Sequence, residues 1–198
     1  AKAATLFKKF KNLDNIIDLL GIAYDAGVRD FMFTTHDRYE LVFDEIRRSN
    51  LFPGLYYSPC LPYAHKYWNK ISQVGFSGML TSLLSQINPL SFTREFSKSI
   101  FLKKNHLTKL LIDIEILMCK GLPIRGIFLQ NLAFDVMLSM DLLNYISGFN
   151  EVVVNRLGVI PGFITMNHSL AVTTLCEKVG IDKPWVCANY NMSGFRMH

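Results

Sequence analysis

Residues 161–191 read PGFITMNHSLAVTTLCEKVGIDKPWVCANYN, a pattern of strand, helix and strand. Residues 162–167 and 185–191 are short, largely apolar runs, each introduced by a proline, and such runs are typical of buried strands. Between them, Ser169 is placed to cap a helix, and Gly180 suits the left-handed position that ends one. Because only a crossover returns the chain in the same direction, the two strands are expected to be parallel.

The same alternation extends over the rest of the chain. Predicted strands lie near residues 30, 55, 77, 127, 164 and 187, with helices predicted over 13–26, 39–48 and 107–120 and a two-piece helix that breaks near Gly148. Gly27 and Gly121 are expected to end the first and third of these helices. This rhythm is typical of βα units.

We therefore predict an α/β fold, a TIM (β/α)8-type barrel that is incomplete in these residues. A complete barrel usually needs about 250 residues, so the first strand is expected before Ala1 and the last βα unit after His198. The alternative is an open doubly wound parallel sheet. Neither GxGxxG nor GxxxxGK[ST], which often mark nucleotide-binding sheets of that kind, occurs in the sequence.

Composition indicates a folded globule with one sizeable core. The 198 residues are 50% hydrophobic and 19% charged, so we expect a single domain over 1–198, with 85–105 as a possible insertion. Residues 71–93 and 157–176 are long apolar stretches, but polar residues, glycine and proline interrupt both. We read them as buried core and expect no transmembrane segment.

Charge and cysteine usage bear on partners and compartment. The four cysteines form no CxxC pair, which favours reduced thiols in a cytoplasmic protein. The net charge of +5 comes from basic residues scattered over helix faces, so no nucleic-acid partner is expected. A small-molecule ligand is expected, and a homo-oligomer is compatible with the sequence.

Three segments carry a family resemblance. They are residues 161–167, residues 187–197, and residues 27–36, the last of which begins with GVRDFM and ends with Thr35 and His36. Together they resemble a pattern in a family of uncharacterised archaeal TIM-barrel proteins. The resemblance covers three strands and implies a barrel that begins and ends outside these residues. That family has no established reaction, so the resemblance assigns no catalytic residue.

Polar residues follow most of the predicted strands, and the carboxyl ends of the strands are where a TIM barrel places its active site. His36 and His168, with Asp37, are the candidates for general acid or base, since imidazole titrates near neutral pH. The candidates for substrate binding are Arg38, His65, Asn131, Asn167, Asn189 and Asn191. The alternative is that the imidazoles cap helices or bind loop backbone, and that Asp37 is only a helix cap.

The residues absent from the strand ends narrow the chemistry. No lysine lies in a predicted strand or at its end, which argues against a Schiff-base aldolase, and one acidic residue there is too few for a glycosidase. No metal site is predicted and the cofactor is left open. The expected function is an enzyme acting on a small polar metabolite, and the alternative is a non-catalytic module that binds a ligand or partner through 85–104.

Overall fold

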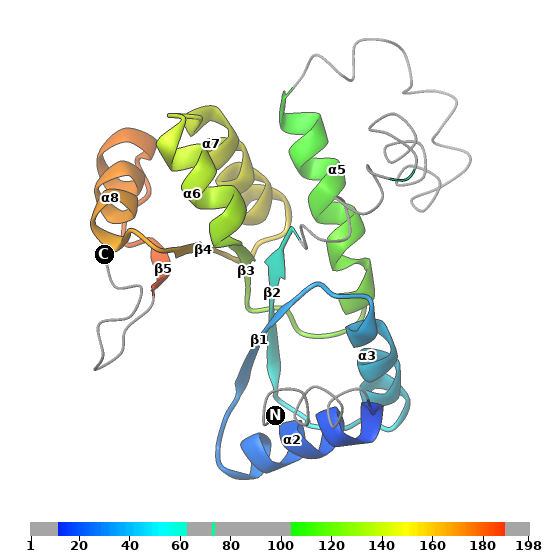
Figure 1. Cartoon of the computed structure of the whole chain (residues 1–198). Coiled ribbons are helices and arrows are strands. Elements are labelled where there is room, and N and C mark those ends of the chain that lie inside the picture. Colours follow the sequence, from blue (N-terminus) through cyan, green and yellow to red (C-terminus); the bar gives the residue numbers. More distant parts are fainter. Residues whose placement is uncertain (1–11, 63–72, 74–103, 189–198) are drawn as a thin grey trace.

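A computed structural model describes residues 12–62, 73 and 104–188 of the chain. Five parallel strands form one sheet whose spatial order follows the chain order (Figure 1). The strands are β1 (Asp30–Thr34), β2 (Tyr56–Leu61), β3 (Gly126–Leu129), β4 (Ile160–Thr165) and β5 (Trp185–Ala188). Each strand pairs in parallel register with the next, from Thr34 opposite Cys60 at one end to Thr165 opposite Ala188 at the other. The sheet curls like half of a barrel.

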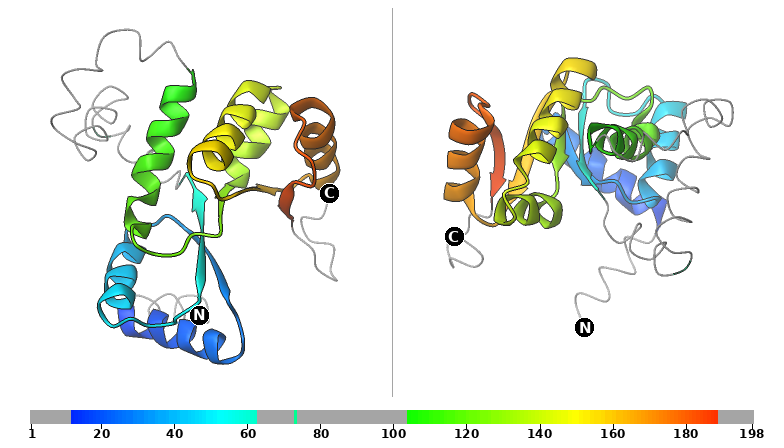
Figure 2. Two further views of the ribbon diagram at one scale, coloured as in Figure 1. Left: turned by 180° about the vertical axis from the view of Figure 1, so that it is seen from behind. Right: turned by 90° about the horizontal axis from the view of Figure 1, so that it is seen from above.

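Helices connect the strands and cover the convex face of the sheet (Figures 1 and 2). They are α2 (Leu13–Asp25), α3 (Arg38–Arg48), α5 (Lys104–Ile116) with the 3-10 turn η2 (Leu117–Cys119), α6 (Asn131–Ser139), α7 (Leu143–Glu151) with the π-helical η3 (Val152–Arg156), and α8 (His168–Thr173) with the π-helical η4 (Thr174–Val179). Alternate strand residues such as Phe33 and Phe163 point to these helices and are buried, as the period of two in a strand requires.

The buried side chains form two clusters. The β1–β2 core comprises Leu20, Phe33, Val42, Phe43, Ile46, Leu55, Tyr57, Met118 and Cys119. The β3–β5 core comprises Leu61, Ile112, Ile127, Leu129, Phe134, Leu138, Ile146, Phe149, Val152, Val153, Phe163, Ala171 and Leu175. Partly buried Ile124 packs against both clusters. The boundary between them lies near the carboxyl end of β2, whose last residue, Leu61, belongs to the β3–β5 core.

The α/β class, the parallel sheet and five of the predicted strands are confirmed. In the described residues the sheet is open, as the alternative prediction has it. Gly27, Gly121 and Gly180 adopt φ values of 94°, 83° and 78° just after helical segments, a left-handed conformation that glycine adopts without steric cost.

The predicted strand near 77 and residues 85–103 lie outside the described residues. β2 and β3 pair directly, with Cys60 opposite Phe128 and Leu61 opposite Leu129.

One predicted helix break is wrong. Gly148 is buried inside α7, and the interruption lies at residues 140–142, where Asp141 adopts a φ of 53°. Aspartate tolerates this left-handed conformation better than most residues because its short polar side chain can bond locally.

Among the described residues, no helix is both long and apolar enough to cross a membrane.

Candidate functional site

Two polar turns stand at the carboxyl edge of the sheet, where all parallel strands end. The first joins β1 to α3 and carries His36, Asp37 and Arg38; the second joins β4 to α8 and carries Asn167 and His168. The two turns are separated by β2 and β3. Three strand spacings amount to about 14 Å along the sheet. A ligand that contacts both turns would therefore have to bridge the concave side of the sheet.

The β1–α3 turn is organised by the His36 backbone and imidazole. The His36 amide donates to the Thr34 carbonyl oxygen at 2.7 Å, and its Nδ1 accepts a hydrogen bond from the Arg38 amide at 3.0 Å. With Nδ1 accepting, the neutral ring carries its proton on Nε2. Asp37 occupies the cap position of α3, but its side chain makes no capping hydrogen bond. The His36 imidazole thus accepts a hydrogen bond at the start of α3, a role that the sequence suggested for the Asp37 side chain.

The β4–α8 turn is held by Asn167 and Asp135. Asn167 Oδ1 accepts the Leu170 amide at 3.2 Å and so caps α8. The prediction that Ser169 caps this helix is wrong, because α8 begins at His168 and Ser169 lies within it. His168, the first helical residue, is exposed, as is Asn167. Both predicted site residues therefore lie at the surface of the carboxyl edge.

The remaining predicted binding residues are placed in part. Asn131 opens α6 directly after β3 and is half-buried, so it also lies at the carboxyl edge, between the two turns. His65, Asn189 and Asn191 lie outside the described residues. The structure thus brings His36, Asp37, Arg38, Asn131, Asn167 and His168 to one edge of the sheet, and assigns none of them a reaction.

Two acidic residues at this edge were not predicted from the sequence. Glu115 of α5 is 2% exposed and accepts a hydrogen bond from the Thr35 hydroxyl. Asp135 of α6 accepts the Thr165 hydroxyl at 2.6 Å and the Met166 amide at 3.0 Å. For Glu115 a signal was present: it stands on the apolar stripe of its helix, four residues after Leu111, where a charge needs a buried partner. Asp135 carries no comparable signal.

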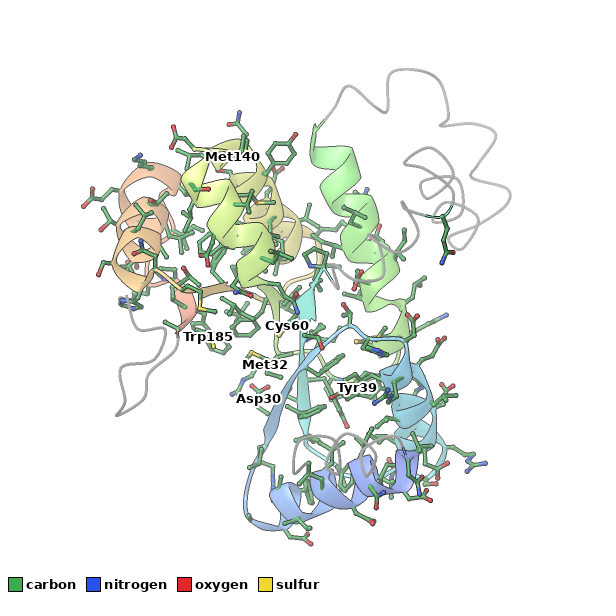
Figure 3. The ribbon with its side chains drawn as sticks, in the orientation of Figure 1. Asp30, Met32, Tyr39, Cys60, Met140 and Trp185 are labelled. Atoms are coloured by element: carbon green, nitrogen blue, oxygen red, sulfur yellow. The ribbon has the colours of Figure 1, made fainter. Side chains whose placement is uncertain are left out.

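The concave face of the sheet carries large apolar side chains. Met32, Tyr56 and Trp185 are 44%, 43% and 39% exposed there. Phe128 on β3 lies across Gly162 on β4 and reaches Trp185 on β5, with ring centroids 6.3 Å apart. Figure 3 shows Asp30, Met32, Cys60 and Trp185 facing this same space, whereas Tyr39 and Met140 belong to the helical layer.

Cys60 lies on the concave face of β2, and its thiol is not activated. Burial raises its pKa to about 12, and the nearby Cys187 thiol adds to the rise. A thiol with that pKa is protonated at neutral pH and is a poor nucleophile. The buried cysteine of β2 therefore packs as a small apolar side chain and offers no nucleophile.

The amino edge of the sheet carries a network of charged and aromatic side chains. Asp30 accepts a hydrogen bond from the Ser58 hydroxyl at 2.8 Å and forms an ion pair with Arg125 at 3.3 Å. The Arg125 guanidinium also lies 5.2 Å from the centre of the Tyr56 ring, within cation–π range. This network links the starts of β1, β2 and β3 and so stabilises the sheet at its amino edge.

The described residues contain no group of three or more His, Cys, Asp or Glu that could hold a metal ion. The fold and the edge define a class: a parallel α/β protein with a curled sheet and a polar carboxyl edge. Comparison with known proteins narrows it no further, since no family model, no curated protein and no solved structure matches the chain.

Proposed function

We propose that the curled sheet is part of a (β/α)8-type barrel and that the protein is an enzyme acting on a small polar metabolite at the carboxyl ends of the strands. The observation that carries the proposal is the strand order. All five strands are parallel neighbours in chain order, without the reversal that marks the ligand site of a doubly wound sheet. With the helices on the convex face, further strands at the two edges would close a barrel.

The concave face supports this reading. A barrel interior is filled by layers of side chains from its strands. Met32, Tyr56 and Trp185 lie on this face and are more than a third exposed in the described structure. Such side chains are ordinary in a closed barrel and costly in water.

Within a barrel mouth, the polar turns have distinct roles. His36 and His168 are the proposed proton-transfer groups, with Asp37 beside the first of them. Arg38, Asn131 and Asn167 offer a cation and two amides to bind carboxylate, hydroxyl or carbonyl groups of the metabolite. His65, Asn189 and Asn191 stay predicted members of the same set.

Barrel closure is testable through Trp185. In a Trp68→Phe variant, Trp185 is the only remaining tryptophan and its fluorescence reports on the concave face. A closed barrel shields it, so acrylamide quenching in the native protein should be far weaker than in urea. Quenching close to that of the unfolded chain would show an open face and contradict the barrel.

The site is testable by ligand-observed NMR with a panel of small hydroxy acids, polyols and sugar phosphates. A compound that binds the wild-type protein should bind at least about tenfold more weakly to His36→Ala or His168→Ala, the loss expected for one hydrogen bond to a polar ligand. Asp182→Asn is the control, because Asp182 is exposed just before β5, at the opposite edge. Equal binding by all variants would remove these histidines from the site.

A further inference from the structure

Two buried threonines occupy equivalent places at the carboxyl edge. Thr35 directly follows β1 and is 0% exposed, and Thr165 ends β4 and is 1% exposed. Each immediately precedes one of the two polar turns. Each hydroxyl donates a hydrogen bond to a carboxylate from a helix of the convex layer, Glu115 of α5 or Asp135 of α6.

The Thr165 contacts extend along the turn. Asp135 accepts the Thr165 hydroxyl with Oδ1 and the Met166 amide with Oδ2, at 2.6 and 3.0 Å. The Thr165 oxygen in turn accepts the Asn167 amide at 2.9 Å. One carboxylate thus fixes three successive residues, and the last of them caps α8 directly before His168. Bonds to a charged acceptor are stronger than those between neutral groups.

The Thr35 contacts hold the other turn. The Thr35 amide donates to the Cys60 carbonyl at 3.3 Å, which extends the β1–β2 ladder by one residue. Its hydroxyl contacts Glu115 and also lies 3.4 Å from the Cys60 carbonyl oxygen. Glu115 is the only buried carboxylate among the residues that the structure describes. Burying a carboxylate is costly unless it is hydrogen-bonded, and the Thr35 hydroxyl supplies one such bond. His36 follows Thr35 directly and starts the next turn.

We propose that Glu115 and Asp135 are positioning residues that act through Thr35 and Thr165 on the turns bearing His36 and His168. Their importance for a reaction rests on the proposed function, but their effect on the turns does not. Each carboxylate controls its own turn: Glu115 fixes the direction in which the chain leaves β1, and Asp135 fixes the exit from β4. A carboxylate that only satisfied a buried hydroxyl would affect global stability and leave the local geometry of both turns unchanged.

The test uses hydrogen exchange and histidine NMR on the whole chain, without any ligand. Asp135→Asn removes the charge and replaces one acceptor oxygen with an NH2 group, so at most one of the two present hydrogen bonds keeps its donor and acceptor, and neither keeps a charged acceptor. The Met166 and Asn167 amides should then exchange about tenfold faster or more, the factor for one charge-assisted hydrogen bond. The imidazole resonances of His168 should shift and those of His36 should not. Glu115→Gln should give the reverse pattern.

Conservative threonine variants separate positioning from packing. Thr165→Ser keeps the hydroxyl and should leave the His168 resonances near their wild-type positions, whereas Thr165→Val should reproduce the Asp135→Asn shift. If both histidines respond equally to either carboxylate variant, or neither responds, the proposal is overturned. It is also overturned if serine and valine at 165 act alike. Should Glu115→Gln not fold, Thr35→Ser against Thr35→Val gives the same comparison for the first turn. A protein that shows these shifts but binds no metabolite would contradict the proposed function alone.

Discussion

Substituting Gly162 with alanine should destabilise the protein through one contact. An added Cβ would lie 2.3 Å from two carbon atoms of the Phe128 ring and 2.8 Å from a third, well inside van der Waals contact. Gly162 is not among the glycines with positive φ, so alanine meets no backbone strain there. Phe128 has little freedom to move, because it is 8% exposed and packs towards Trp185.

The expected magnitude follows from this geometry. Forcing an extra methyl group into a packed interior costs about 1–3 kcal/mol. For a chain of this size each kcal/mol lowers the melting temperature by about 2–4 °C, so Gly162→Ala should melt about 2–12 °C below the wild type. Urea unfolding followed by circular dichroism gives the free energy of unfolding directly.

A double-mutant cycle with Phe128→Leu identifies the cause. Leucine lacks the ring atoms that the new methyl group would strike, so Gly162→Ala should cost much less in the Phe128→Leu background than in the wild type. A coupling energy of about 1 kcal/mol or more is expected for residues in direct contact. The reasoning is refuted if the two substitutions are additive within about 0.5 kcal/mol, or if Gly162→Ala alone costs nothing.

Four further outcomes are expected. Gly21→Ala should stabilise the protein by about 0.5–1 kcal/mol in urea unfolding, because Gly21 lies inside α2 and an added Cβ would meet its nearest neighbour at an ordinary 3.7 Å. Burial raises the pKa of Cys119 to about 12, so iodoacetamide at pH 8 followed by peptide mass mapping should label exposed Cys176 in the native protein and Cys119 only after unfolding. Since a raised folded-state pKa gives stability that is present below the unfolded value and lost above it, the free energy of unfolding should fall between about pH 9 and pH 12, and less steeply in Cys119→Ala. Asn167→Ala should cost about 1 kcal/mol as the loss of a helix cap, whereas Ser169→Ala, a change within the first turn of α8, should cost far less; equal costs would contradict the observed cap.

Much of the fold was predictable because its signals are local. Apolar runs between glycine and proline marked the strands, and Gly27, Gly121 and Gly180 stand where the structure has helix ends in left-handed conformation. The extent of β2 was less evident from the sequence, because the strand runs through Pro59 and continues to Leu61. A proline lacks the amide donor for one ladder bond, yet its φ is compatible with an extended chain, and Phe33 opposite it keeps the register.

The candidate site was less predictable because its contacts join distant residues. Thr35 and Glu115 are 80 positions apart, and Thr165 and Asp135 are 30 apart. A helical stripe indicates that Glu115 faces the protein interior, but which hydroxyl it meets depends on how α5 packs against the end of β1. The choice between Asn167 and Ser169 as cap depended on where the helix begins, and local propensity does not distinguish two good capping residues two positions apart.

The division of the interior into two clusters has a consequence for how the molecule opens. Because the strands follow chain order, nearly all strand contacts join consecutive units, and the β1–β2 core and the β3–β5 core meet at Ile124, at Leu61 of β2 and along α5 and η2. Such an arrangement favours two separately cooperative units rather than one all-or-none transition. Under mild denaturant, amide protection should be lost in two steps divided at the β2–β3 seam. The carboxyl-edge turns fall on opposite sides of that seam, His36 with the first unit and His168 with the second, so unfolding of one unit would release its turn while the other turn stays in place.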